Sequence, residues 1–325
     1  MDDRARLDLT AAAVEREAAR YQAAPRPPMW SRRLFFEEVH RSTALAGSAL
    51  TADEVRGLVE RDVVAPGRTL AENVLVADYG EAARLVRGTP PPRRRTLLAL
   101  DEIAHLHALA VRRTLGARPG RWREATAPAF PSGMVPPPAW MVPRQMDAFA
   151  ERFATAPQPV AERLLWVADA HERFARIHPF DRANGRTGRL VTNLLLRRLG
   201  LPPFVVRRRD ASRYVAALRR ADSRDPVPLA IAIGTSLLES YALLVAEAGT
   251  EADAELAPLA TFAAGPERAA LYKAAQRGRL RVVPRAGALL TKRAWIDEYR
   301  ARARRRPAAR EQASDGHDPR DAEPR

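Results

Sequence analysis

Residues 178–189 read His-Pro-Phe-Asp-Arg-Ala-Asn-Gly-Arg-Thr-Gly-Arg, and a strongly apolar segment follows them directly. Asn is a favoured N-cap residue, so Asn184-Gly185 is predicted to mark the point where a loop enters a helix. Arg186 and Arg189 would then share one face of the first turns. The open N–H groups of a helix N-terminus bind anions, and two guanidinium groups beside them suit a di- or triphosphate. His178, at the start of the loop, is placed to take a proton from a hydroxyl near such phosphates.

This stretch resembles the signature of the Fic family, enzymes that move the AMP part of ATP onto a hydroxyl of a target protein. Seven of the eight fixed positions of that signature match, namely His178, Phe180, Ala183, Asn184, Gly185, Arg186 and Arg189. The eighth position holds an acid in the family and is Arg182 here. In the family that acid holds the magnesium ion that bridges the nucleotide phosphates. Arg182 therefore predicts fixed positive charge in place of the metal, and Asp181, one position earlier, is the alternative metal ligand.

The resemblance implies that ATP or a related nucleotide is the donor and that His178 is the general base. It also implies a nucleotide-binding set, formed by Arg182, Ala183, Asn184, Gly185, Arg186, Gly188 and Arg189. Tyr214 resembles an aromatic position that flanks the adenine, and packing of this tyrosine on its helix neighbours is the equal alternative. A target protein is expected to dock on a β-hairpin flap near 119–143.

Many Fic proteins carry an inhibitory helix whose glutamate pairs with the second arginine of the signature. Residues 42–47 read Ser-Thr-Ala-Leu-Ala-Gly and stand where that helix belongs, with Ala46 at the glutamate position. This degenerate inhibitory position predicts that no carboxylate brake acts through the segment. Two alternatives to AMP transfer stay open at this point. One is an enzyme of this fold that uses another phosphate ester or another acceptor, and the other is an inactive regulator that binds nucleotide or DNA.

Composition narrows the class of protein. The chain has 325 residues, 46% of them hydrophobic, and no cysteine, which excludes disulfides, thiol nucleophiles and Cys-ligated metals. His105 and His107 are two apart on a predicted helix and so make a poor metal pair. The N-terminus lacks the apolar segment of a signal peptide, and the sequence suggests no membrane span. We therefore expect a cytoplasmic protein without a membrane partner.

The pattern of apolar residues predicts a mainly α-helical fold. Helices are expected at 9–22, 30–46, 51–61, 70–87, 94–116, 144–155, 160–176, 185–199, 210–222 and 226–247, and the 51–61 helix opens with a capping box. The proline-rich stretch 117–143 is expected to form loops with at most a short hairpin. The domains predicted are an N-terminal helical region (1–93), a Fic-like core (94–248), a small third domain (251–303) and a disordered tail (304–325).

The third domain resembles the excisionase-like winged helix-turn-helix group. Two short helices, strands near 279–284 and 288–290, and a final helix are expected. Residues 265–310 hold 14 Lys and Arg against three acids, which leaves most of the excess charge of the chain in this region. Such a concentration is the electrostatic footprint of phosphate-backbone binding, so DNA is the expected partner of 265–310.

Overall fold

The computed structural model of the chain describes residues 2–23, 29–90, 97–130, 134–254, 257–285 and 288–304. Within these residues the fold is mainly helical, as predicted. The chain divides into two compact units, Met1–Glu247 and Ala248–Arg325. Residues 1–93, expected to form a region of their own, belong to the same unit as the expected core. The boundary between the two units lies after Glu247, close to the expected boundary at 248–251. The tail expected to be disordered, apart from Arg304, lies outside the described residues.

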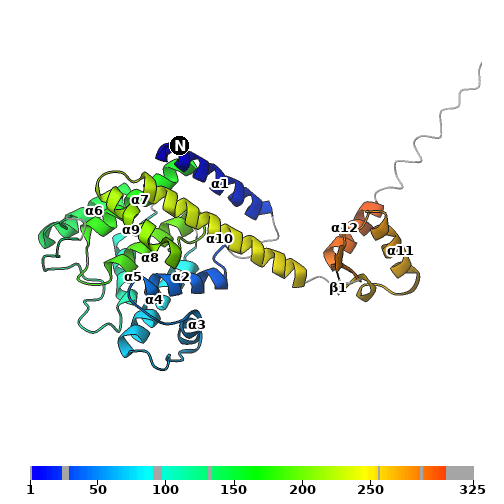
Figure 1. The fold of residues 1–325 in the computed structure, drawn as a ribbon, viewed down its shortest axis with the longest axis horizontal. Helices are drawn as coiled ribbons and strands as arrows, with labels where there is room; N and C mark the ends of the chain where they lie inside the picture. The colour runs from blue at the N-terminus through cyan, green and yellow to red at the C-terminus, as the bar shows by residue number, and fades with distance from the viewer. Residues whose placement is uncertain are drawn as a thin grey trace, which may run out of the picture. The chain divides into compact units, whose positions relative to one another are not determined.

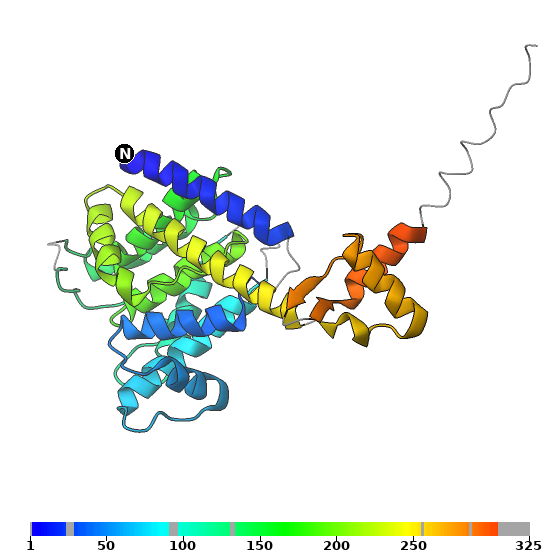
Figure 2. The ribbon, with the colours of Figure 1, turned by 45° about the vertical axis from the view of Figure 1, so that its right-hand side comes forward.

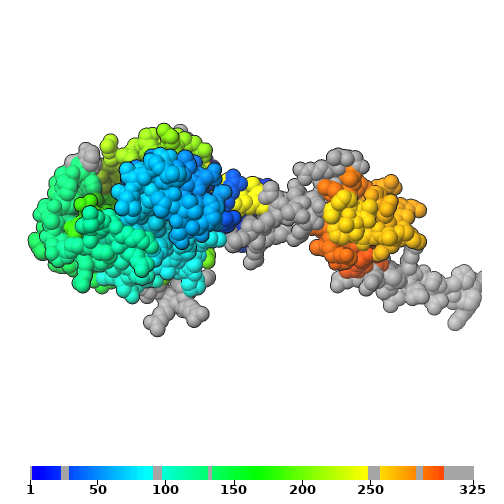
Figure 3. Space-filling model, turned by 90° about the horizontal axis from the view of Figure 1, so that it is seen from below, coloured from blue at the N-terminus to red at the C-terminus, as the bar shows by residue number. Residues whose placement is uncertain are grey.

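The first unit is a helical bundle. Its helices are α1 (Asp3–Ala23), α2 (Arg32–Ala44), α3 (Ala52–Arg61), α4 (Leu70–Gly88), α5 (Leu100–Ala110), α6 (Val142–Arg152), α7 (Val160–Ile177), α8 (Asn184–Arg198), α9 (Ala211–Asp222) and α10 (Val227–Ala254), with short 3-10 turns η1 (Ala139–Met141) and η2 (Arg208–Asp210). Every predicted helix of this unit is present. In the space-filling view of Figure 3, α3 and α4 (blue) and the segment around 100–150 (turquoise to green) form adjoining parts of its surface.

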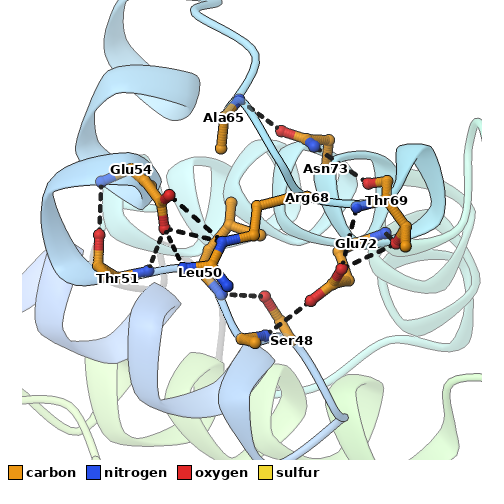
Figure 4. Close-up of polar contacts among 10 residues, drawn as sticks. Ser48, Leu50, Thr51, Glu54, Ala65, Arg68, Thr69, Glu72 and Asn73 are labelled. Atoms are coloured by element: carbon orange, nitrogen blue, oxygen red, sulfur yellow. Dashed lines mark hydrogen bonds and ion pairs between the residues drawn. The ribbon is translucent and has the colours of Figure 1, made fainter.

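Local chemistry explains where α3 and α4 begin. The Thr51 hydroxyl accepts from Glu54 N while the Glu54 carboxylate accepts from Thr51 N, which is the predicted capping box. Thr69 and Glu72 repeat this arrangement at the start of α4. Figure 4 shows both boxes, joined by an ion pair between Arg68 and Glu54. The two helix starts are thus fixed by their own sequence and held to one another.

Helix α8 occupies the centre of the bundle. From Arg186 to Leu196 every residue is buried, in contact with α7, α4, α5 and α2. Gly188 has a packing role in this arrangement, because a Cβ there would stand 3.1 Å from the Phe174 ring of α7. The absence of a side chain at Gly188 therefore lets α8 pack closely on α7, and the nucleotide contact expected for Gly188 stays a prediction. With α8 in the core, Gly185 in its first turn is exposed, and Arg197 and Arg198 at its other end are half-buried.

Helices α1 and α10 lie side by side in both ribbon views (Figures 1 and 2). Gly234 permits this, because a Cβ on it would meet the Thr10 side chain at 2.6 Å. Residues Val227–Glu247 of α10 are long and apolar enough to span a membrane by length and composition. Core helices share that property, and Leu229, Ile233 and Leu237 are fully buried here. The sequence analysis did not single out this segment, and the absence of a membrane span stays a prediction.

Two predicted elements differ from the structure. The helix expected over 94–116 is confined to α5, and Val111 leaves the helical conformation. The described residues of 117–138 form no strand, although Phe130 N donates to Met134 O at 2.8 Å. Prolines explain the missing hairpin ladder, since each lacks the N–H that a ladder needs. The described residues of the flap, 117–130 and 134–138, thus form a loop.

The second unit has its own small core around Leu259, Leu271, Leu280 and Ile296. Its elements are β1 (Ala257–Pro258), η3 (Leu259–Thr261), α11 (Gly265–Gln276), β2 (Val283–Arg285), β3 (Ala288–Thr291) and α12 (Arg293–Arg304). The three strands form an antiparallel sheet in the order β1-β3-β2, with Pro284 opposite Leu289. The predicted pair of strands is present, and β1 is an additional strand that the sequence reasoning missed.

Candidate functional site

The loop between α7 and α8 is framed by two left-handed residues. His178 closes α7 with φ 49°, and Ala183 precedes α8 with φ 60°. Left-handed backbone at residues other than glycine costs energy and concentrates at functional sites. Ala183, not Asn184, is the N-cap residue, which corrects the expectation. The Asn184 side chain instead accepts from Phe180 N at 2.9 Å and donates to Phe180 O at 2.6 Å, so it closes the loop.

His178 has the surroundings of a neutral base. Its ring is partly buried, and it has an edge-on contact with Phe130 at 5.0 Å between centroids. Burial lowers the pKa of His178, and the Arg123 charge lowers it further, against a backbone hydrogen bond at Ala175 that raises it. A histidine with a lowered pKa is unprotonated at neutral pH and can accept a proton.

Arg123 holds this loop in place from the flap segment. Its guanidinium is buried and donates to three backbone carbonyls within 3.0 Å, those of His178 (2.8 Å), Ala125 (3.0 Å) and Pro137 (2.5 Å). Its backbone N also donates to Pro179 O at 2.8 Å. Arg123 therefore ties both sides of the flap to the residues around His178. Sequence reasoning missed this role, because a buried arginine in a loop leaves no periodic pattern.

His107 supports the other end of the loop. Its Nδ1 accepts from Gly120 N at 3.0 Å, which leaves Nε2 to donate to Arg182 O at 3.2 Å. The ring stacks on Phe180 with centroids 3.6 Å apart. Burial, together with the Arg186 charge, lowers the pKa of His107 to about 4. This neutral histidine is a structural link between α5, the flap and the loop, and His105 on the same helix is exposed.

The two signature arginines point to different parts of the bundle. Arg186 is buried and donates to Ala110 O at 3.1 Å, and burial lowers its pKa. Arg189 donates from Nε to the Ser42 hydroxyl at 2.6 Å and from Nη2 to Ser42 O at 2.9 Å. Ser42 is the first residue of the segment that resembles an inhibitory helix. That segment thus contacts the second arginine through Ser42, while Ala46 at the glutamate position is exposed.

A buried carboxylate lies on the same side of α2. Glu38 accepts from the Tyr79 hydroxyl and from Asn193 Nδ2, and it interacts electrostatically with Arg189. Burial raises the pKa of Glu38 to about 7, against the lowering effect of these partners. Glu38 lies two helical turns before Ala46. Sequence reasoning missed Glu38, because a single acid on an amphipathic helix has the same pattern as a solvated residue.

Tyr214 is buried, and its hydroxyl bonds to His171 of α7. The Thr192 hydroxyl donates to Gly188 O, so it accepts from His171 Nδ1, and His171 Nε2 accepts from the Tyr214 hydroxyl at 2.8 Å. His171 is a core histidine, as predicted, and burial lowers its pKa to about 3. The Tyr214 ring is thus engaged in the core, which agrees with the packing alternative.

An adjacent side of α9 borders a cavity of about 180 Å³ near His178. Its lining is mostly apolar and comprises Phe130, Met134, Ala175, Val215, Leu218, Arg219 and Asp222. Phe130 and Ala175 are the residues that contact the His178 ring. Val215 and Leu218 therefore face this cavity, and Tyr214 does not line it.

The acidic position of the signature offers no carboxylate to a magnesium ion. Arg182 stands at the acidic position of the signature with an exposed side chain. Asp181 Oδ2 lies 3.9 Å from Arg118 Nη1, so the one nearby carboxylate already has a cationic neighbour. The described residues contain no group of three or more His, Asp or Glu side chains that could hold a metal ion. What the geometry does offer is an open helix N-terminus, exposed Gly185 and Arg182, and a neutral histidine.

Residues 97–196, which span α5 to α8, match the model of the Fic/DOC family. The chain is similar to protein adenylyltransferase Fic of Nematostella vectensis, at 31% identity over 198 residues, 60% of this chain and 45% of that relative. It is also similar to protein adenylyltransferase fic-1 of Caenorhabditis elegans, at 26% identity over 61% of this chain and 38% of that relative. The chain spans less than half the length of these relatives.

Solved structures show the same fold. Fic-1 from C. elegans superposes with a TM-score of 0.67 at 20% identity, covering 75% of this chain and 73% of that chain. A Fic family protein from Desulfovibrio desulfuricans G20 gives a TM-score of 0.60 at 20% identity, covering 88% and 95%. The match to the Fic/DOC family thus covers residues 97–196, and the solved structures show that the chain shares the fold of Fic proteins.

Proposed function

We propose that this chain transfers a nucleotidyl group, AMP in the first instance, from a nucleotide to a protein hydroxyl. The observation that carries the proposal is the placement of the neutral, partly buried His178 beside the open N-terminus of α8. His178 accepts the proton of the target hydroxyl. The hydroxyl oxygen forms a bond to the α-phosphorus, the bond from that phosphorus to the bridging oxygen breaks, and pyrophosphate leaves. A positioned base contributes about 10²–10⁴-fold to such a rate.

The test is transfer of label from α-labelled ATP to proteins of a cell lysate. His178→Ala is expected to lower the rate by about 10²-fold or more. His105→Ala is the matched control, because His105 is an exposed histidine on α5 that the mechanism does not use. Equal rates for His178→Ala and the native chain would disprove the role of His178.

We place the donor base in the cavity of about 180 Å³ lined by Val215, Leu218 and Phe130. The support is its apolar lining and its contact with the residues that surround His178. Leu218→Asp would put a charge into the cavity and is expected to raise the KM for ATP more than it lowers kcat. Val63→Asp is the control, since Val63 is an exposed apolar residue far along the chain from the motif.

Arg182 bears on whether the reaction uses a metal ion. With a guanidinium at the acidic position, Arg182, Arg186 and the backbone N–H groups of α8 would neutralise the phosphates, and a divalent cation would be repelled. We therefore expect nucleotide to bind without magnesium and AMP transfer to be slow. Arg182→Asp is expected to make binding magnesium-dependent and transfer faster. Strong magnesium dependence in the native chain, lost in Asp181→Ala, would refute this and assign a metal to Asp181.

We propose that the target docks along the flap. A hollow of about 1030 Å³ lies between the segment 117–124 and the start of α6, with Trp122 and Trp140 in its lining. Trp140 is 79% exposed, and exposed tryptophans are frequent anchors of protein interfaces. Trp140→Ala is expected to reduce transfer to protein while leaving nucleotide binding unchanged. Unchanged transfer would remove this hollow from the docking surface.

We propose DNA as a partner of the second unit. Arg277, Arg279 and Arg281 are exposed after α11, and none forms an ion pair within the described residues. The support is this charge together with the order α11, β2, β3, α12. Binding to duplex DNA should weaken steeply with salt, because released counterions drive it. A gel-shift series from about 50 to 200 mM salt tests this, with Arg277→Gln/Arg279→Gln as the weakened variant. A salt-independent affinity, or none, would contradict it.

A further inference from the structure

A strongly basic hollow lies outside the signature loop, on the other side of α2. It has a volume of about 780 Å³ and is bordered by α2, α3, residues 207–209 and α10. Six arginines line it, Arg33, Arg41, Arg56, Arg207, Arg208 and Arg209, against two carboxylates, Glu37 and Glu239. Arg33, Glu37 and Arg41 are four residues apart and so form one face of α2. Ser42, which holds Arg189, lies on an adjacent face.

Both carboxylates are already used to fix the floor of the hollow. Arg207 is a buried residue whose Nε lies 3.0 Å from Glu37 Oε1 and whose Nη1 lies 2.5 Å from Glu239 Oε2. Arg209 pairs with the same Glu239. A buried guanidinium held between two carboxylates is rigidly placed. Glu37 and Glu239 therefore cannot also neutralise the arginines around the rim.

Three of those arginines keep their charge uncompensated. Within the described part of the chain, Arg33, Arg41 and Arg208 form no ion pair with a carboxylate. The Arg41 Nε is buried and has no hydrogen-bond partner there. A buried donor without a partner is costly, and an anion bound beside it would supply the acceptor. The positive charges around the hollow also repel one another, and a bound anion would reduce this repulsion.

The hollow also has an apolar side. Phe36, Ala242 and Leu243 contribute to its lining, and the guanidinium carbon of Arg56 lies 5.8 Å from the centre of the Phe36 ring. A volume of this size accommodates a compact organic ligand or several phosphate groups. Arginine forks match the oxygens of phosphate and carboxylate two at a time, and several guanidinium groups around one hollow favour an anion with several negative charges, such as a chain of phosphates, over a single carboxylate or halide.

We propose that this hollow is a second binding site, for a small anion that carries several phosphate groups. The site is separate from the signature loop and does not depend on the transfer reaction. Its ligand is recognised by Arg33, Arg41 and Arg208 over the fixed floor formed by Arg207. Inorganic polyphosphate and free nucleoside triphosphates share this chemistry, and the experiment distinguishes them.

The test locates the anion by arginine-selective modification of the full chain with phenylglyoxal, followed by mass spectrometry. Sodium tripolyphosphate is expected to protect the exposed Arg33 and Arg208 about tenfold or more, because bound phosphate blocks the reagent. Exposed Arg16 and Arg144, which line no such hollow, should react equally with and without it. Protection confined to Arg182 and its neighbours, with Arg33 and Arg208 unchanged, would overturn the proposal.

Calorimetry supplies the second readout. Arg33→Gln/Arg41→Gln/Arg208→Gln is expected to remove one of the tripolyphosphate sites, whereas Arg16→Gln/Arg61→Gln/Arg144→Gln, with the same charge change, should keep it. Equal affinity of tripolyphosphate and ATP would show that phosphate alone is recognised, and tighter ATP would show a contribution from the Phe36 side. An RNA or DNA oligonucleotide that displaces tripolyphosphate from Arg33 and Arg208 at lower concentration would overturn the small-anion assignment. Identical isotherms for both triple variants would also overturn it.

Discussion

Replacing Arg123 by methionine should both destabilise the first unit and loosen His178. The guanidinium makes three hydrogen bonds of 2.5–3.0 Å, to the carbonyls of Pro137, His178 and Ala125. At about 1 kcal/mol net for each bond, their loss should cost about 3 kcal/mol. For a unit of this size that corresponds to a fall in Tm of about 6–12 °C. Methionine keeps much of the apolar stem, so the loss measures the guanidinium.

Differential scanning calorimetry of the full chain measures the stability, and label transfer from ATP measures the effect on the base. Arg121→Met is the matched control, since Arg121 is an exposed arginine two residues earlier. It should change the Tm by no more than about 2 °C. The reasoning would be refuted if Arg123→Met unfolded at the same temperature as Arg121→Met. If Arg123→Met had the Tm of the native chain but transferred label slowly, Arg123 would affect the reaction and contribute little to the stability of the fold.

Three further predictions follow from the buried groups. Because burial lowers the pKa of His178, the pH profile of kcat/KM should rise to its plateau with an inflection below 6.5, and an inflection above that value would exclude His178 as the base. Glu38 has a pKa raised to about 7, so the folded chain keeps a proton that the unfolded chain releases near 4.5, and stability should fall between these values as pH rises. Urea titrations of Glu38→Gln should lack that fall; a parallel pH dependence would show that another group causes it. Ser42→Ala removes the bond to Arg189 Nε, so it should cost about 1 kcal/mol of stability and increase the transfer rate by freeing the guanidinium; slower transfer would show instead that Ser42 positions Arg189 for the reaction.

The starts of several helices could be predicted because they depend on neighbours in the sequence. Thr51 and Glu54 are three residues apart, and that spacing alone is enough to form a capping box. Helical periodicity located α7 and α8 within one or two residues, because burial of one face requires the pattern. The signature stretch is likewise local, so its family resemblance agrees with the match to residues 97–196.

The partners of the site residues were decided by the tertiary structure alone. Arg189 meets Ser42, which is 147 positions away, and Arg123 meets His178, which is 55 positions away. No sequence pattern records which carbonyl a buried guanidinium will reach, because every backbone position offers the same acceptor. The sequence determined that a basic, glycine-bearing loop precedes a helix after His178. Only the packing of distant segments decided that Tyr214 turns into the core against His171 and that the pKa of His178 is lowered, since burial depends on which segments cover a group.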